Sequence, residues 1–97
     1  MTHFLLQYRP PREGFVKSIT EAEAAIVSEH FEYLRRLHEQ GSVTFAGRVE
    51  DGRVGLAVVC CEDLAAARAL AQADPAVKAN VFTVEVLPFR LSLPQAD

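Results

Sequence analysis

The chain begins with apolar residues at every second position, which is the pattern of a β-strand with one buried face. In residues 3–9, Phe4, Leu6 and Tyr8 fall on one side, so this segment is predicted to be a strand. The segment 10–19 follows, opened by two prolines, and shows no periodicity. We expect it to be the longest irregular loop of the chain.

The pattern then changes to a helical repeat that runs from Thr20 to about Gln40. Thr20 and Glu23 have capping-box spacing at its start, and Gly41 is suited to its end. The residues predicted to share the apolar face are Ile26, Val27, His30, Tyr33, Leu34 and Leu37.

The rest of the chain alternates between strand and helix patterns. The expected elements are strands at 43–49 and 54–61, a helix at 64–73, and a strand from about 80 to 89. Asp51-Gly52 favours a hairpin between the first two of these, and Asp74-Pro75 ends the second helix. The order β-α-β-β-α-β predicts one α+β domain over 1–97 with a ferredoxin-like fold. Two helices would cover one face of a four-stranded antiparallel sheet.

The other face of this sheet is predicted to be apolar as well. The strand at 54–61 is apolar or glycine on both sides. The last strand carries Phe82, Val84 and Val86 on one side and Val81 and Leu87 on the other. An exposed face of this kind normally marks an interface, so we expect a homodimer formed through the sheet face, a dimeric α+β barrel. The alternative is that loops shield these strands.

Composition excludes several classes of partner. The chain has 97 residues, is 49% hydrophobic and has a net charge of −3, which argues against nucleic-acid binding. No apolar run approaches the roughly 20 residues that cross a membrane, and the N-terminal residues do not resemble a signal peptide. Cys60 and Cys61 are adjacent on a predicted strand, point to opposite faces and cannot easily bridge. Reduced cysteines suggest a cytoplasmic protein.

His30 and Asp74 are the candidates for chemistry. An imidazole at the centre of an apolar helix face needs a hydrogen-bond partner, and a carboxylate follows the second helix. If the two meet, Asp74 fixes the tautomer of His30, which prepares it for acid–base work. The alternatives are that His30 is a core histidine whose hydrogen bonds are made within the core, and that Asp74 is an ordinary turn residue. No HxxxH, CxxC or GxGxxG pattern occurs, so no metal or cofactor is expected.

These elements, taken together, resemble the YCII-related family of small dimeric α+β proteins. The fragments that carry the resemblance are His30–Leu34 with Leu37 and Gly41, Phe45–Gly47, Ala73–Phe82 and Val84–Phe89. The resemblance implies an active site built from a histidine and an aspartate, which match His30 and Asp74. It also implies a link to dehydrochlorination of hydroxylated aromatics. Val27 stands where many relatives have arginine, and Arg48 where many have proline.

The leading hypothesis is a small enzyme that transfers protons on a lactone, an enol or a hydroxylated aromatic. His30 would be the acid or base and Asp74 its orienting partner, with Tyr8, Tyr33 and Arg48 as substrate contacts. Arg48 would suit an anionic substrate. A non-catalytic domain that binds a small molecule is the second hypothesis, and a purely structural or interaction protein is the third.

Overall fold

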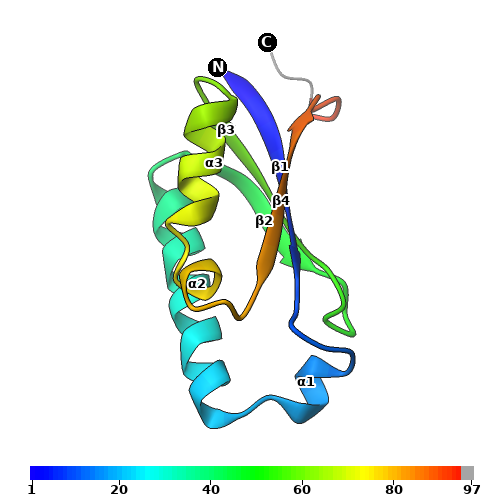
Figure 1. Ribbon diagram of the computed structural model, residues 1–97. Coiled ribbons are helices and arrows are strands. Elements are labelled where there is room, and N and C mark those ends of the chain that lie inside the picture. Colours follow the sequence, from blue (N-terminus) through cyan, green and yellow to red (C-terminus); the bar gives the residue numbers. More distant parts are fainter. Residues whose placement is uncertain (95–97) are drawn as a thin grey trace.

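The computed structural model describes residues 1–94 and has the predicted α+β architecture. Its elements are β1 (Thr2–Arg9), α1 (Phe15–Ser18), α2 (Glu21–Glu39), β2 (Val43–Arg48), β3 (Gly55–Cys61), α3 (Leu64–Gln72), α4 (Pro75–Lys78) and β4 (Thr83–Phe89). The strands form one antiparallel sheet in the order β2-β3-β1-β4. The longer helices, α2 and α3, lie on the same face of it, here called the inner face (Figure 1). The ferredoxin-like prediction is confirmed.

The caps predicted from the sequence are present at both ends of α2. The hydroxyl of Thr20 accepts a hydrogen bond from the backbone N–H of Glu23 at 3.1 Å, and the Glu23 carboxylate accepts one from the Thr20 N–H at 3.0 Å. Gly41 follows the helix with φ of 86°, a conformation that glycine adopts without steric cost. The capping box predicted from the sequence is therefore present, and α2 spans the expected residues.

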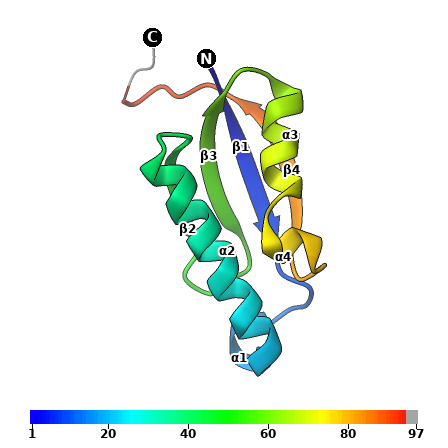
Figure 2. The same cartoon turned by 90° about the vertical axis from the view of Figure 1, so that its left-hand side faces the viewer.

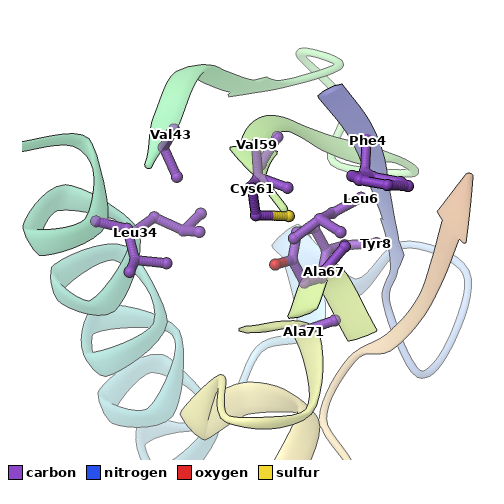
Figure 3. Close-up of a cluster of buried hydrophobic side chains, with 11 residues drawn as sticks. Phe4, Leu6, Tyr8, Leu34, Val43, Val59, Cys61, Ala67 and Ala71 are labelled. Carbon is purple, nitrogen blue, oxygen red and sulfur yellow. The ribbon is translucent and has the colours of Figure 1, made fainter. Parts of the chain in front are cut away.

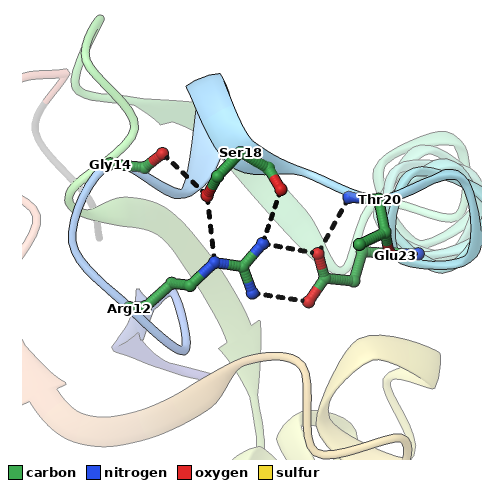
Figure 4. A network of polar contacts seen from close by, with 5 residues as sticks. All are labelled: Arg12, Gly14, Ser18, Thr20 and Glu23. Atoms are coloured by element: carbon green, nitrogen blue, oxygen red, sulfur yellow. Dashed lines mark hydrogen bonds and ion pairs between the residues drawn. The ribbon is translucent and has the colours of Figure 1, made fainter.

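The segment expected to be irregular contains a short helix, α1. Arg12 holds it against the start of α2: its guanidinium donates to both carboxylate oxygens of Glu23 at 2.8 Å and also to Ser18 (Figure 4). Phe15 of α1 is only 5% exposed and packs with Ala76 and Val81. The expectation of a loop was wrong at residues 15–18 because this burial and the arginine contacts order the segment.

A second short helix, α4, lies between α3 and the last strand, in a segment where no element was expected. Asp74 caps it by accepting the Ala76 N–H at 2.9 Å, and Pro75 occupies its first position, where no N–H is needed. Asn80 then turns the chain with φ of 59°, so β4 begins at Thr83 rather than near residue 80. The error arose because the sequence around Pro75 ends one helix and also starts another.

The helices divide the inner face between them. Figure 2 shows α2 on the side of β2, and α3 with α4 on the side of β4. A large core cluster fills the space beneath α3. It contains Phe4, Leu6, Tyr8, Val59, Cys61, Ala67 and Ala71, joined by Leu34, Leu37 and Val43 from the α2 side (Figure 3).

The outer face of the sheet, opposite the helices, carries an apolar row across the four strands. Phe45 is opposite Val58, Val58 is opposite Leu5, and Leu5 is opposite Leu87. Val58 is fully buried, whereas Phe45 at the edge is 48% exposed. The sequence pattern of apolar residues on both faces is therefore present in the structure.

Two further sequence expectations concern the cysteines and the membrane. Cys60 and Cys61 are both free, with Cys61 in the core cluster and Cys60 half-buried on the opposite face. Among the described residues, no helix has the length and apolar character needed to cross a bilayer.

Candidate active site

A cavity of about 570 Å³ lies between α2 and the strands β2 and β3. It exists because the inner face of these strands carries small residues where β1 and β4 carry large ones. Ala46 and Gly55 both line it. A Cβ added at Gly55 would meet the Tyr8 Cβ at 3.6 Å and the Gly47 carbonyl oxygen at 3.8 Å, so a larger residue would project into the space without a clash. The missing side chains thus leave a space beneath the helix.

His30 of α2 lines this cavity and is paired with Asp74 behind it. The His30 Nδ1 lies 2.6 Å from the Asp74 Oδ2. The His30 side chain is 14% exposed and the Asp74 side chain is fully buried. A buried carboxylate requires such partners, since an unpaired one would be strongly destabilising. The structure therefore joins the two residues that the sequence could only suggest as a pair.

The second carboxylate oxygen of Asp74 fixes the orientation of the carboxylate toward His30. Oδ1 accepts the Ala76 N–H at 2.9 Å, so the carboxylate is anchored at the start of α4 while Oδ2 faces His30. An ionised carboxylate only accepts hydrogen bonds, which places the imidazole proton on Nδ1. The Nε2 atom of His30 is then left with a free lone pair. That is the arrangement of a histidine ready to act as a base.

Two aromatic rings contact the imidazole of His30 and fix its orientation. The ring of Tyr8 lies 4.9 Å from the His30 ring at an interplanar angle of 77°, and that of Phe82 lies at 5.1 Å and 84°. Both contacts are edge-to-face, the geometry that aromatic pairs prefer. Rotation of His30 would break these contacts and the bond to Asp74 together, so the side chain is firmly oriented.

The hydroxyl of Tyr8 lies beside this pair, close enough to Asp74 to interact with its carboxylate. Tyr8 is 3% exposed and lines the cavity, and its Oη has no hydrogen-bond partner among the described residues. Burial, and then the nearby charge of Asp74, raises the pKa of Tyr8. The phenol therefore stays protonated. A buried, unsatisfied hydroxyl costs about 1–3 kcal/mol, a cost that a hydrogen-bonding ligand would remove.

The other two predicted contacts are placed differently. Tyr33 does not line the cavity: its hydroxyl donates to the Leu70 carbonyl at 2.6 Å, and burial raises its pKa. It therefore links α2 to α3. Arg48 does line the cavity, and its Nη1 donates to the Glu50 carbonyl at 2.7 Å.

Several lining residues were missed by sequence reasoning. His38 lines the cavity near the end of α2, with its Nδ1 2.8 Å from the Val43 carbonyl oxygen. Phe82, which also lines the cavity, was expected only as an apolar residue on one side of the last strand. A signal for Gly55 existed, since glycine inside a strand often marks a close approach. The described residues contain no group of three or more side chains suited to a metal ion.

Comparison with known proteins places the chain among related sequences and folds. A family model described as the YCII-related domain matches residues 1–90. No curated protein sequence matches the chain. The fold is similar to that of the 5-chloro-2-hydroxyhydroquinone dehydrochlorinase TftG from Burkholderia phenoliruptrix AC1100, solved in complex with 2,5-dihydroxybenzoquinone. The TM-score is 0.67 at 17% identity, over 96% of this chain and 99% of that chain.

Proposed function

Because the chain belongs to the YCII-related domain family, we propose that it is a small enzyme that transfers protons on a hydroxylated aromatic or a related enol or lactone. The single observation that carries this proposal is the pairing of His30 with a buried Asp74 on the wall of a cavity. A fixed carboxylate behind an imidazole, with the far nitrogen free, is how proteins prepare histidine for acid–base work.

The proposed chemistry begins with a proton on the substrate hydroxyl. The Nε2 of His30 takes this proton, and the electron pair of the broken O–H bond moves into the ring to form a carbonyl. A ring double bond then takes up this proton from the imidazolium at another carbon. Where that carbon carries a leaving group, His30 removes the proton of a second hydroxyl, a second carbonyl forms, and the leaving group departs with its electron pair. Asp74 stabilises the imidazolium while it lasts, and the protonated Tyr8 donates a hydrogen bond to the oxygen on which charge develops.

The structural neighbour supports the choice of substrate class. TftG is named for its action on a chlorinated hydroxyhydroquinone, and its fold matches nearly the whole of both chains. At 17% identity this likeness does not carry its substrate over. The aromatic frame around His30, made by Tyr8 and Phe82, independently favours a flat ring as ligand.

The test is turnover in the wild type and in His30→Gln. A panel of 5-chloro-2-hydroxyhydroquinone, unchlorinated hydroxylated aromatics and simple lactones would be followed by chloride release and by absorbance. We expect turnover of at least one compound, lowered about 10²–10⁴-fold in His30→Gln, the usual worth of a general acid or base. The matched control is His3→Gln, on the outer face of β1. Equal rates in wild type and His30→Gln would refute the role.

We also propose that a second copy of the chain covers the outer face of the sheet. Support comes from the apolar row of Phe45, Val58, Leu5 and Leu87, which two copies would bury against each other. Leu5→Glu should yield monomers in sedimentation at concentrations where the wild type is dimeric. Phe31→Glu, an equally drastic change at a 63% exposed position on α2, should leave the dimer intact. A monomeric wild type would refute the interface.

A further inference from the structure

The charges that line the cavity differ in sign from those of the whole chain. The chain has 13 acidic residues and 10 lysines and arginines, yet among residues 1–94 no Asp or Glu lines the cavity. The ionisable side chains that line it, besides Tyr8, are Arg35, Arg48, His30 and His38. A site lined this way in an acidic protein attracts anions rather than cations.

Arg48 is the member of this group that is free to pair with a ligand. Arg35 is occupied on both sides, since it donates to Glu32 at 2.6 Å and to Glu39 at 2.7 Å. Arg48 has no ion pair among the described residues, and its side chain uses only Nη1, to the Glu50 carbonyl. The remaining N–H groups of its guanidinium are available for a carboxylate or phenolate, which arginine binds in a paired geometry.

The sheet register places Arg48 across an empty position from Tyr8. Arg48 is opposite Gly55, and Gly55 is opposite Tyr8, so the three share one row of the inner face. Two strand spacings put the Cα atoms of Arg48 and Tyr8 roughly 10 Å apart. Since glycine has no side chain, the space over Gly55 lies between a cation on one side and the Tyr8 hydroxyl, next to His30, on the other.

His38 is not part of this arrangement. It lies eight residues beyond His30 on α2, which is about 12 Å along the helix axis. A small ring held at His30 and Tyr8 would therefore not reach it. Its Nδ1 is also occupied by the Val43 carbonyl.

We propose that the substrate class of this site is a hydroxylated aromatic ring that carries an acidic substituent. The substituent pairs with Arg48, the ring lies over Gly55, and the reacting hydroxyl meets Tyr8 and His30. This inference rests on the proposed function and adds a charge requirement to it. The apolar walls, which include Val27 and Leu56, accept the ring without competing for its charge.

The test compares two probes that differ by one carboxylate, 2,5-dihydroxybenzoate and hydroquinone, by calorimetry on the full chain. We expect the wild type to bind 2,5-dihydroxybenzoate at least about tenfold more tightly, as a charge-assisted pair should. Arg48→Gln should abolish this preference, and Arg48→Lys should restore part of it. Arg36→Gln is the matched control: it removes the same charge from an exposed position on α2 that does not line the cavity, and should keep the preference.

The outcomes separate this inference from the proposed function. Equal affinity for the two probes, no binding of 2,5-dihydroxybenzoate, or a preference that survives in Arg48→Gln would overturn the charge requirement. Each of these results leaves His30 chemistry on a neutral ring in place. Loss of the proposed function, in contrast, would be seen as turnover that does not depend on His30. Because Arg48 is exposed, its variants should fold, which thermal melting of each would verify.

Discussion

The two halves of the inner sheet face are built differently although they belong to one sheet and share one core. Beneath α3 and α4, β1 and β4 contribute large side chains such as Phe4, Leu6 and Val86, and the space is filled. Beneath α2, β2 and β3 contribute Ala46 and Gly55, and a cavity remains. One half thus stabilises the fold while the other is left open for a ligand. The His30–Asp74 bond joins the halves, since α2 carries the histidine and the turn before α4 carries the aspartate.

The largest expected effect compares the same truncation in both halves. Leu6→Ala in the filled half, at a side chain 1% exposed, should lower the free energy of unfolding by about 3–5 kcal/mol, because it opens a void in a packed core. Leu34→Ala, at the cavity wall, enlarges a space that already exists and should cost at least about 1 kcal/mol less. Urea unfolding measures both. Equal costs would show that the two halves are packed alike.

Asp74, which joins the two halves through its bond to His30, should give the next largest effect. Asp74→Ala leaves the Ala76 N–H and the His30 Nδ1–H without an acceptor and should destabilise by about 1–3 kcal/mol. Asp74→Asn keeps an oxygen for the Ala76 N–H, so it should lose less stability while activity still falls at least about tenfold. Thermal melts and rates on the same samples separate the two effects. An Asp74→Asn variant with full activity would contradict the orienting role.

A smaller effect, of opposite sign, is expected in the open half. Gly55→Ala should raise stability by about 0.5–1 kcal/mol, since glycine is unfavourable inside a strand and the new methyl group fits. The same methyl group should weaken ligand binding. Gly47→Ala is the comparison for stability alone, because its Cβ would meet nothing within 4 Å and gains the strand preference without a contact to Tyr8. A Gly55→Ala variant that binds ligand as well as the wild type would show that this position does not shape the site.

The smallest effect concerns the hydrogen bonds by which Arg12 holds α1 against the start of α2. The hydrogen bonds from Arg12 lower the pKa of Glu23 from 4.5 to about 2. A carboxylate whose pKa is lowered by folding stabilises the fold fully at pH values above its pKa in the unfolded chain. This contribution is lost as the pH falls to the pKa of the folded state. The melting temperature of Glu23→Gln should thus be slightly below that of the wild type at neutral pH, and the gap should close between about pH 4.5 and 2. A gap that keeps its size down to pH 2 would contradict this account.

The fold was predictable because its signals are local. The capping box of Thr20 and Glu23, the Asp-Gly hairpin and the alternation in β1 each specify an element within a few residues. The short helices α1 and α4 were missed because they depend on distant contacts. Phe15 is buried by Ala76 and Val81, which lie more than half the chain away.

The site was predictable only in part, for the same reason. His30 stood out as a polar residue on an apolar helix face, and Asp74 as a carboxylate before proline. Their bond spans 44 positions, which no periodicity reveals. Tyr33 shares the apolar face with His30, but that face is wide enough for one edge to meet α3 and the other the cavity. The cavity itself arises from absent side chains at Gly55 and Ala46, which leave no pattern in the sequence.

The central claim is that His30 presents a free Nε2 to a ligand in the open half. Long-range ¹H–¹⁵N NMR of the imidazole rings, at mildly alkaline pH and with 2,5-dihydroxybenzoate added, tests it most directly. We predict that His30 is protonated on Nδ1 in the free protein and that the ligand shifts its Nε2 resonance, whereas His3 is unaffected. Protonation of His30 on Nε2, or a ligand that leaves the His30 resonances unchanged, would contradict the account.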